Sequence, residues 1–228
     1  MDYDVKIVGG TIMDGTGNQG YRGDLGIQGG RVVALGEAKG EAGRTIDAGG
    51  LVVCPGFVDI HTHYDAQVLW DQMLTISPWH GVTTAVMGNC GFGVAPMRPA
   101  DRQDIMKTLE KVEGMSYAAL EAGLGLDWPF ESFPEYMDVV QQGGTAINMA
   151  AFIGHTPLRI YVMGDDAMER EATGAEVEAM AQIVREAMAA GAIGFSTSQA
   201  ATHNAFDGRP IPSRLASFSE LDALVGAM

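Results

Sequence analysis

Residues 51–63 read LVVCPGFVDIHTH, an apolar run that ends in two histidines two positions apart. A short apolar run bounded by turn-forming residues is typical of a buried strand. Three further apolar runs, at 81–87, 146–153 and 192–195, each end at glycine or at small polar residues. Helical patterns lie between them, and strands that alternate with helices predict a parallel α/β sheet. We therefore expect residues 55–228 to form part of a (β/α)8 TIM-like barrel, with about four of its eight βα units.

Two capping boxes mark where helices of this region begin. Thr173 is followed three residues later by Glu176, and Ser132 by Glu135, and both pairs precede apolar residues at helical spacing. Ser219 precedes a last amphipathic run, so we expect it to cap a helix at the end of the sequence. A complete barrel takes about 250 residues, and we therefore expect 55–228 to be the N-terminal half of one, truncated.

The first 54 residues have a different pattern. Short β-branched runs alternate with glycines, and Gly29-Gly30 is a hairpin signal because both positions accept positive φ. No helical periodicity interrupts these runs. We expect residues 1–54 to form a small antiparallel β unit, a portion of a β-sandwich, and the domain boundary to lie between 54 and 55.

Composition excludes several classes of function. The chain has 29 acidic and 14 basic residues, a net charge of −15, and no basic stretch that could neutralise phosphates, so nucleic-acid binding is not expected. No apolar run approaches the roughly 20 residues of a membrane span. The N-terminus lacks the pattern of a signal peptide, and two cysteines are too few for a disulfide scaffold. We expect a cytoplasmic protein with no membrane partner.

The histidines of the opening stretch are candidate metal ligands. Side chains two apart on a strand point to the same side, so His61 and His63 project together. At the end of a barrel's first strand they would lie over the mouth, where barrel enzymes bind substrates and metals, and two neutral imidazoles can share one divalent ion. We expect Asp59 and Asp65 to accept hydrogen bonds from these imidazoles and orient them.

Longer motifs resemble a known family. Residues 55–63, PGFVDIHTH, resemble the first-strand signature of the metal-dependent amidohydrolase superfamily. Residues 64–71 and 80–93, the latter reading HGVTTAVMGNCGFG, are more narrowly similar to the N-acyl-D-amino-acid deacylases, or D-aminoacylases. Further similar stretches occur at 159–164, 191–198 and 207–210. The resemblance extends over the whole chain, but only over the N-terminal half of the family's pattern.

The resemblance implies a third metal ligand. Many amidohydrolases bridge two metals with a modified lysine at the end of strand four, where this chain has Ser196, Thr197 and Ser198. The D-aminoacylases instead use a cysteine at the end of strand two, which is the place of Cys90. A thiolate is a strong zinc ligand, so the resemblance implies one or two Zn2+ ions held by His61, His63 and Cys90.

The resemblance also implies the reaction, which is the hydrolysis of a carbon–nitrogen bond other than a peptide bond. The substrate would be a small N-acyl-D-amino acid, split into a carboxylate and a D-amino acid. The aspartate that acts as general base and two further histidine ligands are expected beyond Met228. We therefore expect the isolated chain to be inactive or weakly active, and to pair with a complementing C-terminal half or with a second copy, since a half barrel exposes sheet edges.

Weaker candidates and other interpretations remain open. His155, Ser198 and His203 follow the third and fourth strands and could line a substrate pocket, although a structural role is favoured for His155 and is equally open for His203. A cyclic-amide hydrolase or a deaminase of the same superfamily is disfavoured by Cys90 and by the missing lysine. A non-catalytic metal-binding or assembly module is the alternative outside the enzymes.

Overall fold

The computed structural model describes all residues from 1 to 228, and they form two compact units, Met1–Gly56 and Phe57–Met228. The division falls two residues after the expected boundary. Each unit has its own sheet.

The first unit is a single five-stranded sheet. Its order is β3-β2-β1-β4, with β5 beside β1. The expected hairpin is present: β2 and β3 pair antiparallel, and Gly29 and Gly30 between them have φ of +57° and +72°. The pairing is nevertheless mixed, because β1 runs parallel to β4 and to β5, which corrects the expectation of an antiparallel unit. The strands are β1 (Tyr3–Ile12), β2 (Tyr21–Gln28), β3 (Arg31–Gly36), β4 (Ala42–Asp47) and β5 (Val52–Val53).

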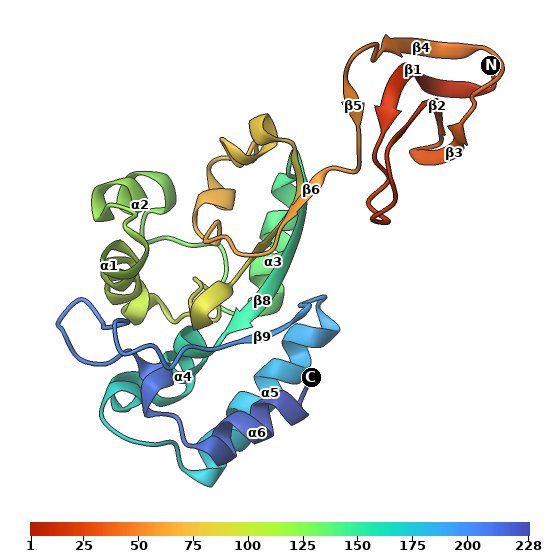
Figure 1. Cartoon of the computed structure of the whole chain (residues 1–228). Helices are drawn as coiled ribbons and strands as arrows, with labels where there is room; N and C mark the ends of the chain where they lie inside the picture. The colour runs from red at the N-terminus through yellow and green to blue at the C-terminus, as the bar shows by residue number, and fades with distance from the viewer. The chain divides into compact units, whose positions relative to one another are not determined.

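The second unit contains the expected half barrel. Four parallel strands follow one another in the order β6-β7-β8-β9, the order in which they occur in the sequence. They form a curled sheet, and α3 lies behind β8 in the view of Figure 1. The strands are β6 (Phe57–Asp59), β7 (Val82–Met87), β8 (Asn148–Gly154) and β9 (Gly194–Ser196).

Helices connect these strands, and the capping boxes lie where the sequence predicts them. Ser132 and Thr173 each accept a hydrogen bond from the backbone N–H of the glutamate three residues later, and each glutamate side chain returns the contact. The helices are α1 (Arg102–Glu113), α2 (Tyr117–Leu124), α3 (Phe133–Gly143), α4 (His155–Met163), α5 (Gly174–Ala189) and α6 (Phe218–Gly226). Short 3-10 turns are η1 (Gln67–Leu69), η2 (Ser77–His80), η3 (Asn89–Gly91), η4 (Pro99–Asp101), η5 (Gly164–Met168) and η6 (Pro212–Leu215).

The cap of α6 differs from the expectation. Ser217, not Ser219, occupies the N-cap position, and its hydroxyl accepts a hydrogen bond from the backbone N–H of Glu220 at 3.2 Å. Ser217 is in the extended conformation that an N-cap requires, with φ of −72° and ψ of 160°. The two serines differ by two positions, and the expectation that Ser219 caps the helix is wrong.

The core of the second unit lies between the sheet and the helices. Met87 of β7 and Ile153 of β8 are fully buried and face the helices, as the alternation of side chains along a strand requires. The helices contribute Phe133, Leu158, Met180 and Val184 to the same core.

A buried ion cluster attaches α6 to α4. The Glu220 carboxylate accepts hydrogen bonds from Arg159 Nη1 at 2.6 Å and from His155 Nε2 at 2.8 Å, and all three side chains are inaccessible to solvent. Burial by itself would raise the pKa of Glu220, but His155 and Arg159 outweigh burial and lower that pKa. The carboxylate is therefore held ionised inside the core.

Removal of Glu220 should strongly destabilise the fold. Glu220→Ala leaves the Arg159 guanidinium buried without a counter-charge, which costs about 3–5 kcal/mol of the free energy of unfolding. Urea denaturation of the 228-residue chain measures this loss. Asp222→Ala on the exposed side of α6 is the control, with an expected change within about 0.5 kcal/mol. Equal losses in the two variants would contradict the role of the cluster.

Candidate metal centre

The segment after β6 is fixed to β7 through Thr62. Its backbone N–H and its hydroxyl both donate to the carbonyl oxygen of Val86, at 3.0 and 2.8 Å. Thr62 is buried, whereas His61 is exposed and His63 is partly buried. This is the expected alternation, in which the residue between the histidines faces away from them.

Cys90 lies in the tight turn that follows β7. Its own φ is +56°, an uncommon value for a residue with a side chain, and Gly88 and Gly91 on either side have φ of +79° and +74°. A Cβ on Gly88 would collide with the carbonyl oxygen of Phe152. The turn is thus pressed against β8, and this close approach requires glycine.

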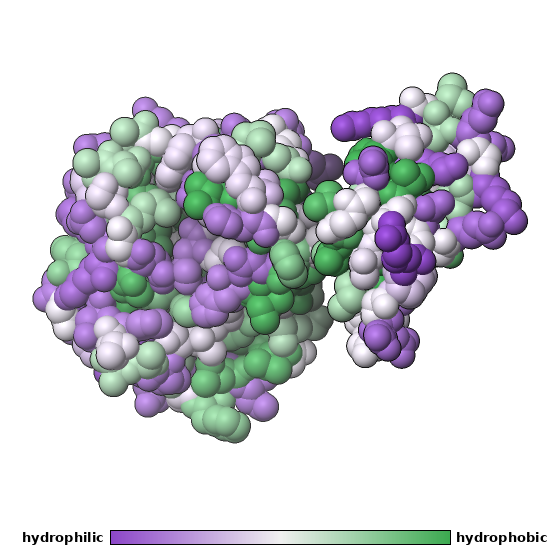
Figure 2. Space-filling model, turned by 45° about the horizontal axis from the view of Figure 1, so that its top comes forward, coloured by the Kyte–Doolittle hydropathy of each residue, from purple (hydrophilic) through white to green (hydrophobic).

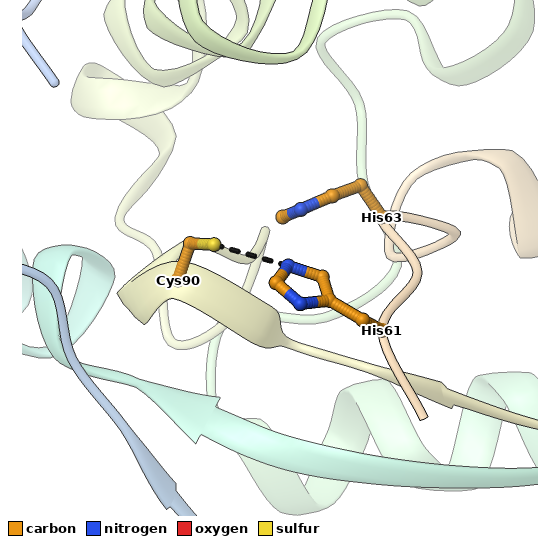
Figure 3. Close-up of side chains that lie close together, drawn as sticks. All are labelled: His61, His63 and Cys90. Carbon is orange, nitrogen blue, oxygen red and sulfur yellow. Dashed lines mark hydrogen bonds between the residues drawn. The ribbon is translucent and has the colours of Figure 1, made fainter. Parts of the chain in front are cut away.

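Figure 3 shows His61, His63 and Cys90 pointing into one space. One ligand atom from each lies within 4.8 Å of the others. His61 Nε2 is 3.2 Å from Cys90 Sγ, and the centroids of the two imidazole rings are 5.4 Å apart. The structure therefore brings together the three residues that the sequence predicts as ligands, although they come from two segments nearly thirty residues apart.

Two further side chains hold the Cys90 turn in place. Asp65 is buried, and its carboxylate accepts a hydrogen bond from the backbone of Gly88; burial outweighs this bond and raises the pKa of Asp65 to about 7. Ser196, the last residue of β9, donates to the carbonyl oxygen of Gly88, while its oxygen accepts from the backbone N–H of Gly91 at 3.0 Å. The turn is thus tied both to the segment after β6 and to β9.

The sequence predicts that Asp59 and Asp65 orient the imidazoles of His61 and His63, and neither aspartate does so. The carboxylate of Asp59 accepts from the backbone N–H of His61 at 3.2 Å, so it orients the main chain and not the imidazole. Asp65 lies against the Cys90 turn. The carboxylate that does contact an imidazole belongs to Glu113, whose Oε2 is 3.1 Å from His63 Nε2. Nothing in the local sequence marks Glu113, which is fifty residues away and ends α1.

The remaining candidates for a substrate pocket, His155, Ser198 and His203, lie in two places. His155 is fully buried, with Nδ1 2.8 Å from Thr197 Oγ1 and Nε2 bonded to Glu220, so the structure places it in the ion cluster and not on an open pocket. Ser198 Oγ and His203 Nδ1 are 2.8 Å apart, and both residues are partly buried. His203 is close enough to His63 for its charge to lower the pKa of that imidazole.

The protonation state of His63 suits a metal ligand, whereas the Cys90 thiol is protonated until an ion binds. Burial, followed by the charges of His61 and His203, lowers the pKa of His63 to about 4, so its imidazole is neutral at neutral pH, the form that binds metals. Burial, followed by the charge of Glu113, raises the pKa of the Cys90 thiol. A coordinated thiol is deprotonated by the cation itself.

Two imidazoles and a thiol are the donors that zinc prefers, and a catalytic zinc site keeps a further position open. His63 Nδ1 is buried and has no hydrogen-bond partner in the protein. His61, His63 and Cys90 can therefore hold a metal ion.

A parallel half barrel with a candidate metal-ligand set at the carboxyl ends of its strands places the chain in the barrel class of proteins, whose functional sites lie at that end. Residues 44–228 match the sequence profile described as the amidohydrolase family, and the chain belongs to that family. No helix of the chain is both long and apolar enough to cross a membrane.

Two curated relatives within this family match most of the chain. A D-aminoacylase of Alcaligenes xylosoxydans xylosoxydans is 41% identical over 196 residues, which are 86% of this chain and 37% of that protein. An N-acyl-D-aspartate deacylase of the same organism is 37% identical over 195 residues, 85% of this chain and 36% of that protein. The chain thus spans little more than a third of the length of these relatives.

Solved structures agree with the sequence relatives. A crystal structure of D-aminoacylase superposes with a TM-score of 0.78 at 34% identity, covering 98% of this chain and 42% of that one. The N-acyl-D-glutamate deacylase of Bordetella bronchiseptica, complexed with zinc and a phosphonate inhibitor, gives 0.73 at 34% identity, covering 100% of this chain and 43% of that one. These neighbours confirm the partial barrel and the resemblance to D-aminoacylases.

The turn that carries Cys90 should tolerate no side chain at Gly88. Gly88→Ala adds a collision with Phe152 to the cost of a left-handed residue, so its loss of unfolding free energy should exceed that of a purely conformational change by about 1–3 kcal/mol. Gly114→Ala is the matched control, because Gly114 has φ of +70° and open space around a new Cβ. Thermal denaturation compares the two variants, and equal losses would show that β8 does not constrain the turn.

Proposed function

We propose that His61, His63 and Cys90 supply the first metal ligands of a zinc-dependent deacylase that hydrolyses N-acyl-D-amino acids. The observation that carries the proposal is the convergence of His61, His63 and Cys90 within 4.8 Å. Two curated relatives are named as a D-aminoacylase and an N-acyl-D-aspartate deacylase, and a solved neighbour is described with zinc bound. The substrate class and the metal come to this chain from those likenesses.

In the proposed reaction, bound zinc supplies Lewis acidity, which activates a water molecule and polarises the amide carbonyl. The imidazoles of His61 and His63 and the thiolate of Cys90 would hold the ion at the mouth of the barrel. Asp65 and Ser196 maintain the conformation of the Cys90 turn through its backbone. No lysine stands at the end of β9, so Cys90 would supply the remaining ligand beside the two histidines.

We propose that part of the active site is supplied from outside these 228 residues. His155 is used in the ion cluster, and His80 lies before β7, at the opposite end of the strand from Cys90. The general-base aspartate and two further histidine ligands would be contributed by the second half of the barrel. The isolated chain should then have little or no activity, and its expected cytoplasmic location remains a prediction.

The surface of the second unit supports this division. β6 and β9 each have a strand partner on one side only. Exposed apolar side chains include Phe57 (62%), Ile60 (72%) and Phe218 (84%), and Figure 2 shows hydrophobic residues at the surface. Exposed strand edges and apolar surface are the features by which sheets associate, so we propose that a complementing half barrel, or a second copy, covers them.

Zinc analysis beside an activity assay tests the proposal. The purified 228-residue chain should bind zinc and release no D-amino acid from N-acetyl-D-amino acids. Cys90→Ala should lose the zinc, whereas Cys54→Ala, which removes the other free cysteine from the first unit, should keep it. Zinc retained in Cys90→Ala would show that the ligand assignment is wrong.

The substrate class is tested on a longer protein in which these residues continue into a complete barrel. It should hydrolyse N-acetyl-D-amino acids and leave the L enantiomers intact. Full turnover by the 228-residue chain alone would contradict the proposed division of the site. Zinc binding without turnover in the complete barrel would instead favour a non-catalytic module.

A further inference from the structure

The segment between β9 and η6 lies at the carboxyl end of the half barrel. Residues 199–210, here called the strap, follow the fourth parallel strand and precede η6. The imidazole of His203, in the strap, lies against the ring of Phe92, with the two ring centroids 5.4 Å apart. Phe92 directly follows the Cys90 turn. The strap therefore borders the candidate metal centre at the end of β7.

The strap also reaches α1, which borders the same centre. The carbonyl oxygen of Ala205 accepts a hydrogen bond from Lys111 Nζ at 3.0 Å. Lys111 lies two residues before Glu113, whose carboxylate contacts His63. Figure 1 shows the strap, in blue, extending from β9 toward α1. The strap thus touches two segments that flank the candidate metal centre, the Cys90 turn and the end of α1.

Hydrogen bonds to a buried serine hold the base of the strap. Ser213 is inaccessible to solvent, and its hydroxyl donates to the carbonyl oxygen of Ser198 at 2.9 Å. The side chain of Gln199 donates to the carbonyl oxygen of Ser213 at 2.7 Å. Arg214 Nη1 donates to the carbonyl oxygen of His203 at 3.1 Å. These bonds join the chain at the two ends of the strap, so its base is fixed.

The tip of the strap, residues 205–209, is a turn closed on itself. The backbone N–H of Ala205 donates to the carbonyl oxygen of Arg209 at 2.8 Å, and that of Gly208 donates to the carbonyl oxygen of Ala205 at 2.9 Å. The Asp207 carboxylate accepts from Arg209 Nε at 2.7 Å. Since these bonds lie within the tip, the tip can move as one piece without losing them.

The contacts that attach the tip to the rest of the unit are weak. Besides the bond to Ala205, Lys107 Nζ lies 5.0 Å from the centroid of the Phe206 ring, and Arg209 pairs with Glu169. The side chains of Lys107 and Arg209 are 34% and 41% exposed, so water competes for their charges and each contact contributes little. Ala205 is the only buried residue of the tip, and its side chain is a single methyl group. The tip is therefore held more weakly than the base.

We propose that the strap is a lid of the candidate metal centre, whose tip leaves α1 while its base stays attached. The structure shows the closed position, in which His203 lies beside Phe92. When the tip leaves α1, the strap withdraws from the rim of the centre and widens the entrance for a small ligand. Loops that follow barrel strands carry the active sites of barrel enzymes, and such loops close over bound ligands. The motion is independent of the proposed function, whereas the role as a lid rests on it.

Limited digestion of the 228-residue chain with chymotrypsin tests the motion, because Phe206 must detach from α1 to enter the protease. When opening is faster than cleavage, the cleavage rate follows the open population. Lys107→Ala and Lys111→Ala should each raise the rate of cleavage after Phe206 by about two- to fivefold. Arg185→Ala removes an exposed cation from a surface ion pair of α5 and should leave that rate unchanged. Equal rates in the lysine variants and the parent chain would overturn the proposal.

Urea dependence separates opening of the strap from unfolding of the whole unit. Opening of the strap exposes little surface, so cleavage after Phe206 should respond to urea much less steeply than global unfolding measured by circular dichroism. If cleavage and global unfolding respond equally to urea, the strap opens only when the chain unfolds, and the proposal fails.

The role as a lid is tested on the longer protein with a complete barrel, in the presence of zinc and a phosphonate analogue of an N-acyl-D-amino acid. Binding of the phosphonate should favour the closed strap and slow cleavage after Phe206. A cleavage rate that the bound phosphonate leaves unchanged would overturn the lid. If this longer protein hydrolyses no N-acyl-D-amino acid but the lysine variants still open the strap, the proposed function fails while the motion of the strap stands.

Discussion

Two hydrogen bonds from Thr62, one from its backbone and one from its hydroxyl, end on the carbonyl oxygen of Val86. They extend the parallel pairing of β6 with β7 beyond the last strand residue, which sets where the chain after β6 lies relative to the turn after β7. Since side chains alternate along an extended segment, fixing Thr62 on one side presents His61 and His63 on the other. The distances to Cys90 depend on this attachment and on the hydrogen bond from the Asn89 side chain to the carbonyl oxygen of Thr62.

The Cys90 turn shows how a barrel scaffold supports an unfavourable local conformation. A cysteine with positive φ costs free energy that a strand or helix residue does not. The surroundings offset this cost: Asp65 bonds to the backbone of the turn from one side, Ser196 does so from β9, and Asn89 donates to the carbonyl oxygens of Thr62 and Val86. Three parallel strands thus contribute to the placement of one thiol. None of these bonds uses the sulfur, which lies 3.2 Å from His61 Nε2.

Carboxylates serve two separate purposes in the second unit. In the interior, Glu220 is ionised and paired with Arg159 and His155. It joins α6 to α4, although its two partners lie 61 and 65 residues earlier in the sequence. At the centre, Asp65 and Glu113 are buried near the ligands, and burial raises the pKa of both. A cation in the space between His61, His63 and Cys90 would favour the ionised forms of these acids, since an opposite charge nearby lowers a carboxyl pKa.

The sequence by itself determined the elements and the ligand types. The spacing of His61 and His63, the alternation of strands with helices, and the capping boxes at Ser132 and Thr173 all follow from local geometry, which short stretches of chain encode. Contacts between distant segments decided the rest. Three such contacts join residues 39 to 65 positions apart: the parallel pairing of β1 with β4, the bond between His155 and Glu220, and the approach of Glu113 to His63. No local pattern distinguishes Glu113 from other helical glutamates, because its contact with His63 depends on where α1 ends in the folded chain.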